Sequence, residues 1–227
     1  MHIEPGLVAP TKMVIGYVTA AGFLALSMRS FLIDIVKGAI IRVAVGMVVT
    51  IVVTLLSFEI LPHPLVGVSE VHLIVGATLY LLFGFAPVAI GMAGGLLIQG
   101  LFFAPADIAQ YGMNVTTLLA SLYAIDFVAT RGAYSRTRYV DMSYGRVAKL
   151  SLCFQGSIVA WVAFWVLLGQ GATFATLQSI TSFGATYVLL ITVEVALGIG
   201  MLSLVRSIHS GRVQHILNPR LFAVPTA

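Results

Sequence analysis

The sequence predicts an all-α, polytopic membrane protein, a bundle of about seven transmembrane helices. Two features of composition lead to this class: 59% of the 227 residues are hydrophobic, and only 9% are charged. A soluble domain carries about 25% charged residues, so this chain has too few to face water on all sides. The third feature is that the basic residues are sorted by loop, so the pI near 9.4 reflects membrane topology rather than nucleic-acid binding.

Seven stretches are apolar enough to cross a bilayer, which takes roughly 17–25 residues each. The third and fourth are short and are joined through Phe85-Ala86-Pro87, where proline breaks a helix, so we expect a tight hairpin there. Residues 1–227 form one integral membrane domain, with an N-terminal segment 1–12 and a cytoplasmic tail 206–227. The expected spans are 13–28, 39–58, 72–86, 87–103, 113–130, 148–168 and 183–205.

The basic residues select the orientation of the chain. With the N-terminus outside, eleven Lys and Arg residues fall in the inner loops and tail, and only Lys12 falls outside. This asymmetry is the positive-inside pattern, so we expect a multi-pass protein of the cell inner membrane with a cytoplasmic C-terminus. The inner basic residues are Arg29, Lys37, Arg42, Arg131, Arg136, Arg138, Arg146, Lys149, Arg206, Arg212 and Arg220.

The first six residues, M-H-I-E-P-G, can chelate a metal ion. The terminal amine, the His2 amide nitrogen and the His2 imidazole close two small rings on one ion. Such an all-nitrogen, near-planar set suits Ni(II), Cu(II) and Co(II), and its nitrogens must be deprotonated, so acid weakens binding. The alternative is that His2 is accidental. No basic n-region precedes the first span, so we expect no cleaved signal peptide and a mature chain that keeps Met1.

The predicted topology brings a second imidazole to the same face of the membrane. The loop 59–71 lies outside, and His72 lies at the outer end of the third span, 70 positions after His2. His72 is therefore a candidate metal ligand; the alternative is a satisfied residue at a helix start. Glu70 either orients His72 as an outer carboxylate or is solvated. The outer face also holds His63 and Asp107, whereas the tail holds His209 and His215.

Two further polar residues are candidates for supporting roles. Asn114, in Y-G-M-N-V, begins the fifth span, where it either caps the helix or contacts the N-terminal segment. Glu194 lies midway along the seventh span, where a charge costs about 2.5–3.5 kcal/mol, so it faces the protein interior or is neutral. It either marks a transport path or is a structural carboxyl hydrogen-bonded to Gln99 or a neighbouring threonine.

Other patterns favour structural explanations. Gly91 and Gly95 form a G-x-x-x-G in the fourth span, a spacing that lets helices approach closely. The segment 131–149 is basic and rich in tyrosine, which favours contact with inner-leaflet lipid or docking of a cytoplasmic partner. The sequence contains no Walker A motif, no Ser-His-Asp or Cys-His set on one face, and no histidine deep in a span. We therefore expect neither an enzyme nor a bound cofactor.

Several stretches resemble one known family. They are M-H-I with Gly6, G-V-S-E-V-H-L at 67–73, the V-G-A-T-L-Y-L-L-F-G-F-A-P that follows, I-Q-G-L-F-F at 98–103 and Y-G-M-N at 111–114. Their order and spacing are similar to the CbiM/NikM family, the substrate-binding (S) membrane components of energy-coupling-factor ABC transporters for cobalt and nickel. Glu194 looks like the glutamate of the family's last helix. The resemblance covers most of the chain.

The resemblance implies a seven-helix domain whose N-terminal segment folds back into the bundle. It implies that the Met1 amine, the His2 amide and imidazole, and His72 hold the metal, the same residues that the topology places on one face. Glu70, Asn114 and Glu194 would then support these ligands. The implied partners are a membrane T-component, cytoplasmic ATPase subunits and a small auxiliary membrane subunit, within the lipid bilayer and without nucleic acid.

Three positions depart from the family pattern. Glu4-Pro5-Gly6 stands where the family has Asp or a similar residue with Gly, Ser57-Phe58-Glu59 stands where it has N-F-P, and Tyr187 stands where its last helix has a histidine. These changes leave open whether the metal is Ni²⁺ or Co²⁺, but they do not touch Met1, His2 or His72.

The sequence therefore favours a membrane protein that captures Ni²⁺ or Co²⁺ outside and passes it inward. Two alternatives remain. The first is a regulatory or transport-defective membrane subunit, motivated by Ser57 and Tyr187. The second is a stand-alone metal carrier in which Glu194 couples transport to protons.

Overall fold

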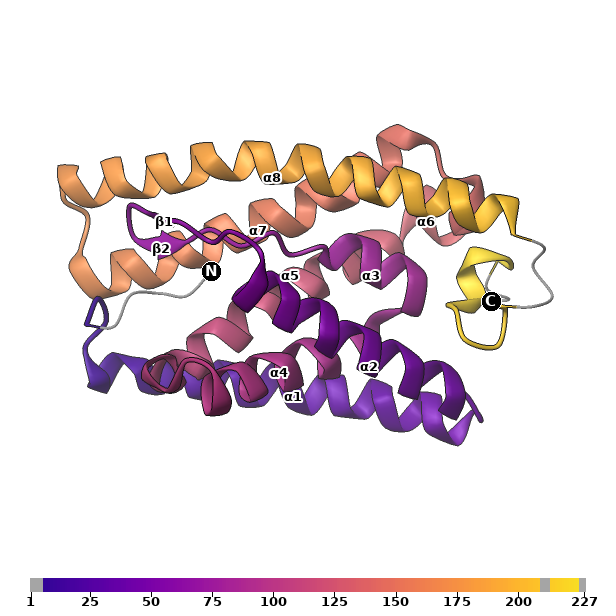
Figure 1. Cartoon of the computed structure of the whole chain (residues 1–227), viewed down its shortest axis with the longest axis horizontal. Helices are drawn as coiled ribbons and strands as arrows, with labels where there is room; N and C mark the ends of the chain where they lie inside the picture. Colours follow the sequence, from indigo (N-terminus) through magenta and orange to yellow (C-terminus); the bar gives the residue numbers. More distant parts are fainter. Residues whose placement is uncertain (1–5, 209–212, 225–227) are drawn as a thin grey trace.

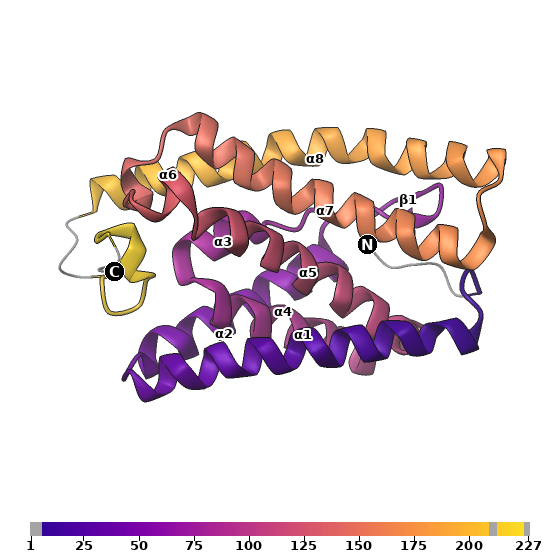
Figure 2. The same cartoon turned by 180° about the vertical axis from the view of Figure 1, so that it is seen from behind.

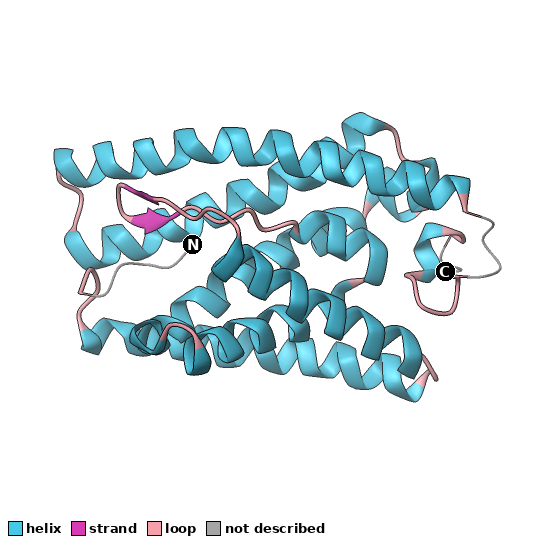
Figure 3. Cartoon of the chain, viewed as in Figure 1, coloured by secondary structure: helices cyan, strands magenta, loops and turns pink. Residues whose placement is uncertain are grey.

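The computed structural model describes residues 6–208 and 213–224, and in this part of the chain it is an all-α bundle (Figure 1, Figure 3). Six of its eight α-helices are long and apolar enough to cross a membrane, so the predicted fold class is confirmed. The helices are α1 (Pro10–Val36), α2 (Ile40–Leu55), α3 (Gly76–Phe83), α4 (Phe85–Phe102), α5 (Tyr111–Ala129), α6 (Gly132–Ser135), α7 (Tyr144–Gln170) and α8 (Phe174–Ser207). The shorter elements are η1 (Leu56–Ile60), β1 (Leu65–Val66), β2 (Ser69–Glu70), η2 (Pro105–Gln110), η3 (Tyr139–Asp141) and η5 (Pro219–Leu221).

The third crossing of the bundle differs from the predicted helix 72–86. Residues 71–75 are not helical, and α3 has only eight residues, about 12 Å of helix against a hydrocarbon layer of about 30 Å. The break expected at Pro87 falls instead at Gly84, whose φ of 87° suits glycine. Pro87 lies in the first turn of α4, where its missing N–H removes no helical hydrogen bond.

The G-x-x-x-G glycines bring α4 against α2. A Cβ added to Gly91 would lie 2.6 Å from Thr50 Cβ, and one added to Gly95 would lie 2.8 Å from Thr54 Cβ. Because these contacts advance in the same direction along both helices, α2 and α4 run parallel. The chain between them must therefore return to the other end of the bundle, and residues 71–83 make that return.

α3 lies at the centre of the bundle, with all eight residues buried. Two distant groups cap its last carbonyls: Arg42 Nη1 donates to Phe83 O at 3.0 Å, and Asn218 N donates to Leu82 O at 2.7 Å. Residues 213–224, within the predicted tail 206–227, thus pack onto the bundle at the same end as α6 (Figure 2). Helix α8 itself continues to Ser207.

The first described residues pack at the end of the bundle opposite to α6. Val8 is 1% exposed and packs against Met113 of α5 and Trp165 of α7. Gly169 leaves room for this passage, since a Cβ there would lie 2.2 Å from Leu7 O. Figure 2 shows the beginning of α1 beside the turn between α7 and α8. The chain therefore packs closely against α5 and α7 just before α1 begins.

The close α2–α4 contact predicts that adding one methyl group at Gly91 destabilises the protein. Gly91→Ala places a methyl group against Thr50 and Met47 O, so it should destabilise the protein by about 1–3 kcal/mol. Thermal unfolding of the purified protein in detergent measures this loss. Gly156→Ala is the matched control, because nothing lies within 4 Å of its Cβ and alanine favours a helix. Equal melting temperatures for Gly91→Ala and wild type would contradict the packing.

Candidate metal centre

A two-stranded hairpin leads the chain to the candidate site. β1 pairs antiparallel with β2, and the turn between them begins with Gly67 at φ 66°. Val68 has no positive φ, so the turn has the pattern of type II′, which requires glycine at the first central position. A Cβ on Gly67 would also lie 2.5 Å from Ser179 O of α8. Glycine here lets the hairpin lie directly on α8, and residues 71–75 then run into the bundle (Figure 1).

His72 lies in this segment and not at a helix start, so that part of the sequence prediction is wrong. Its side chain is 0% exposed. The ring of Phe58 stacks on it with centroids 4.2 Å apart, and the ring of His63 lies 5.1 Å away. Both rings are nearly parallel to the imidazole, at 24° for Phe58 and 17° for His63, so each stacks on it.

Hydrogen bonding determines which ring nitrogen can bind a metal. His72 Nδ1 lies 3.1 Å from Ser57 O, and a carbonyl oxygen can only accept, so Nδ1 carries the proton. The lone pair of the neutral ring is then on Nε2, which lies 3.0 Å from Glu70 Oε2. A proton or a metal ion shared at these two atoms satisfies both. Glu70 therefore lies at the nitrogen proposed for the metal, and the group that orients the ring through the other nitrogen is Ser57 O.

The short helix η1 contains Ser57-Phe58-Glu59, the stretch that departs from the family pattern. Two of these residues contact His72. Ser57 acts through its backbone carbonyl, and Phe58 acts through its ring. Glu59 accepts a hydrogen bond from Gln99 Nε2 at 2.9 Å, so Gln99 is not the partner of Glu194. The side chain at position 57 is therefore not the group that orients His72.

Asn114 does not cap α5. The N-cap is Gln110, and Asn114 lies within the first turn, 2% exposed. Among the described residues its Oδ1 has no hydrogen-bond partner. Its neighbour Met113 packs against Val8, so Asn114 lies beside the path by which the chain enters the bundle.

Glu194 is a hydrogen-bonded carboxyl with partners that the sequence did not indicate. Its Oε1 accepts from Ala77 N at 2.8 Å, and its Oε2 accepts from Gln155 Nε2 at 2.8 Å. Gln155 was missed because it lies on another helix. Tyr187 precedes Glu194 by two helical turns on the same face of α8, and its hydroxyl adjoins the backbone of His72.

Other expected residues lie elsewhere. Met1, His2 and His209 fall outside the described residues. Asp107 lies in η2, and His215 lies in the segment that packs at the α6 end. Within residues 6–208 and 213–224, no group of three or more His, Cys, Asp or Glu side chains is arranged to hold a metal ion. His72 is thus the one sequence-predicted ligand that the structure describes.

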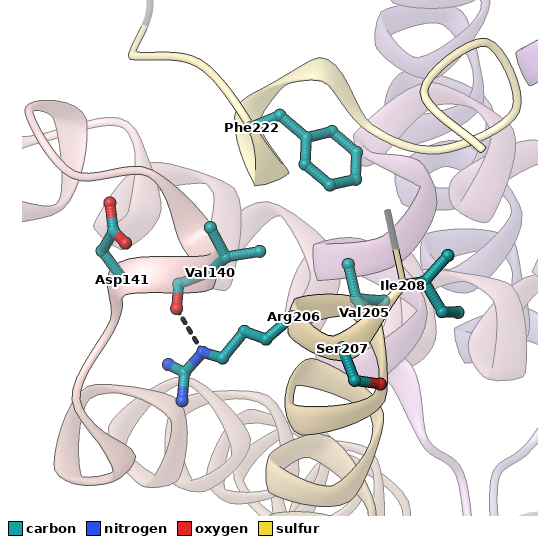
Figure 4. A pocket seen from close by; sticks show the side chains of 7 residues that line it. All are labelled: Val140, Asp141, Val205, Arg206, Ser207, Ile208 and Phe222. Carbon is teal, nitrogen blue, oxygen red and sulfur yellow. Dashed lines mark hydrogen bonds between the residues drawn. The ribbon is translucent and has the colours of Figure 1, made fainter. Parts of the chain in front are cut away.

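A pocket of about 650 Å³ lies far from His72, at the end of α8. Figure 4 shows Arg206 reaching across it to donate to Val140 O. Asp141, at its edge, is paired with Arg138. The 34 residues of α8 extend about 50 Å, and the hairpin lies near their beginning, so this pocket is not the metal centre. Its lining consists of Val140, Asp141, Val205, Arg206, Ser207, Ile208 and Phe222.

A family model described as the cobalt uptake substrate-specific transmembrane region, CbiM, matches residues 2–212. No curated protein and no solved structure gives a significant match. The matched range contains the hairpin, His72, Asn114, Gln155 and Glu194.

Proposed function

Because the chain belongs to the CbiM family of cobalt uptake substrate-specific transmembrane regions, we propose that it is the substrate-capture component of an energy-coupling-factor importer for Co²⁺ or Ni²⁺. The observation that carries this proposal is His72. It is a fully buried imidazole whose Nδ1 is engaged by Ser57 O, so the metal would bind at Nε2, where Glu70 Oε2 lies 3.0 Å away. A ring oriented through its other nitrogen is typical of metal-binding histidines.

In the proposed site, four nitrogens hold the ion: the Met1 amine, the His2 amide, the His2 imidazole and His72 Nε2. A near-planar nitrogen set binds Ni²⁺ more tightly than Co²⁺, following the general order of divalent metals. The packing of Val8 between α5 and α7 supports this arrangement, because it starts the first residues from a fixed point at the end of the bundle where the hairpin lies.

Two side chains near this position have the chemistry of supporting groups. Glu70 brings a carboxylate oxygen to 3.0 Å from His72 Nε2, which offsets the charge of a divalent ion. Asn114 has a buried amide oxygen without a partner among the described residues, next to the Met113 side chain that contacts Val8. We assign it to contact with the first residues of the chain.

The importer would need further subunits. The sequence has no ATP-binding motif of the Walker type, so energy would come from cytoplasmic ATPase subunits acting through a membrane T-component, with a small auxiliary subunit. The basic segment 131–149 lies at the α6 end, where such subunits would dock. The proposed orientation places the His72 end outside the cell inner membrane.

Binding measurements test the capture role. Calorimetric titration of Ni²⁺ and Co²⁺ into the purified protein should show binding that falls at least about 100-fold in His72→Ala and in His2→Ala, because each removes a ligand. One extra residue before Met1 should do equal damage, since it displaces the terminal amine. His215→Ala is the control imidazole, because His215 is exposed and lies in the segment that packs at the α6 end, away from His72. Unchanged affinity in both histidine variants would refute the site.

Uptake by cells separates this role from the two alternatives. Cells that carry the chain and its partners should accumulate the metal, and uptake should stop when the ATPase partner is deleted. A transport-defective or regulatory subunit would leave uptake unchanged when it is removed. A stand-alone carrier coupled to protons through Glu194 would continue to work without the ATPase.

A further inference from the structure

The segment that carries His72 is held from two helices that are remote in sequence. Gln155 of α7 and Glu194 of α8 are both 0% exposed. The two hydrogens of Gln155 Nε2 are both used: one is donated to Ile74 O at 2.7 Å and the other to Glu194 Oε2 at 2.8 Å. The second carboxylate oxygen of Glu194 accepts from Ala77 N at 2.8 Å. This pair therefore bridges the backbone on both sides of Gly76.

That bridge lies where the extended segment becomes a helix. Ala77 N belongs to the first turn of α3, whose N–H groups lack partners within the helix. The local N-cap residue, Val75, makes no side-chain cap hydrogen bond. A carboxylate at this end also complements the helix dipole. Glu194 thus supplies from α8 the cap that the local sequence omits.

Gly76 is tightly packed at this junction. A Cβ on Gly76 would lie 2.1 Å from the ring of Phe154, the residue that precedes Gln155 on α7. Phe154, through its ring, and Gln155, through its side-chain amide, therefore contact the same turn of the chain. Because Ile74 is two residues after His72, the position of the imidazole along the bundle depends on this junction.

We propose that Gln155 and Glu194 are positioning residues for metal capture, which hold residues 74–77 so that His72 Nε2 meets the ion at the correct place. The inference rests on the proposed capture function. Neither side chain touches the ion. They act through the backbone between Ile74 and Ala77, and His72 receives its own orientation from Ser57 O.

Substitutions that exchange the side-chain amide of Gln155 and the carboxyl group of Glu194 test this pair directly. Glu194→Gln sets two amide groups against each other, and Gln155→Glu sets two carboxylates against each other. Each should weaken Ni²⁺ binding by about 10–100-fold, the range found when groups behind metal ligands are altered. The double variant, with Gln155→Glu and Glu194→Gln together, restores one donor and one acceptor between the two side chains and an acceptor for Ala77 N. It leaves Ile74 O without its donor, so it should recover only part of the affinity lost by Gln155→Glu. Binding by both single variants within twofold of wild type would overturn the proposal.

A second readout separates positioning from general stability. Amide hydrogen exchange in the metal-free protein should speed up at residues 71–77 in both single variants and return toward wild type in the double variant. Gly91→Ala is the matched control: it should lower the melting temperature through α2 and α4 yet leave Ni²⁺ affinity unchanged. If Gly91→Ala weakens binding as much as Glu194→Gln at equal loss of stability, the positioning role is refuted.

The same series distinguishes failure of the two proposals. If wild type binds Ni²⁺ and His72→Ala does not, while the Gln155 and Glu194 variants bind normally, the capture site stands and only the positioning role falls. If wild type and His72→Ala bind Ni²⁺ equally, the capture site falls, and the positioning role falls with it.

Discussion

Non-helical backbone inside a membrane protein needs hydrogen-bond partners from the protein, because lipid supplies none. This constraint governs the segment that leads into α3. The carbonyl of Ile74 and the amide of Ala77 find their partners in Gln155 and Glu194, and the amide of Val71 donates to Pro64 O at 3.1 Å. A continuous helix would satisfy its own backbone hydrogen bonds. The buried side chains of Gln155 and Glu194 would then lack these backbone partners. The non-helical stretch and the polar groups of α7 and α8 therefore explain one another.

Much of the fold could be predicted from composition and the order of apolar stretches. Each of the six long helices overlaps an expected span, because hydropathy over about 20 residues directly reflects the thickness of the bilayer. The bounds differ most at α1 and α8, which extend well beyond the spans expected at 13–28 and 183–205. The third crossing could not be predicted in the same way. The stretch 71–83 is as apolar as a helix, but hydropathy does not distinguish extended backbone from helix. The difference lies in Glu194 and Gln155, which stabilise the junction from elsewhere in the chain.

The site was predictable where residues are close in sequence and unpredictable where they meet only in three dimensions. Glu70 and His72 are two positions apart, and their contact follows from that spacing. Asn114 lies in the first turn of α5, near the expected start of the span, but its burial beside Met113 depends on where Val8 packs. Gln155 lies 39 residues from Glu194, and no local pattern connects them. The role of Ser57 was also hidden, since a backbone carbonyl leaves no mark in the sequence.

The contacts at the C-terminal end of α3 determine where this protein can be cut or fused. Asn218 provides the donor for the carbonyl of Leu82, and Arg42 provides the donor for the carbonyl of Phe83. A chain shortened after Ser207 loses the first of these donors together with the buried Leu221. Residues 213–224 are thus packed on the bundle, and a cut or a fusion point belongs after them rather than before them.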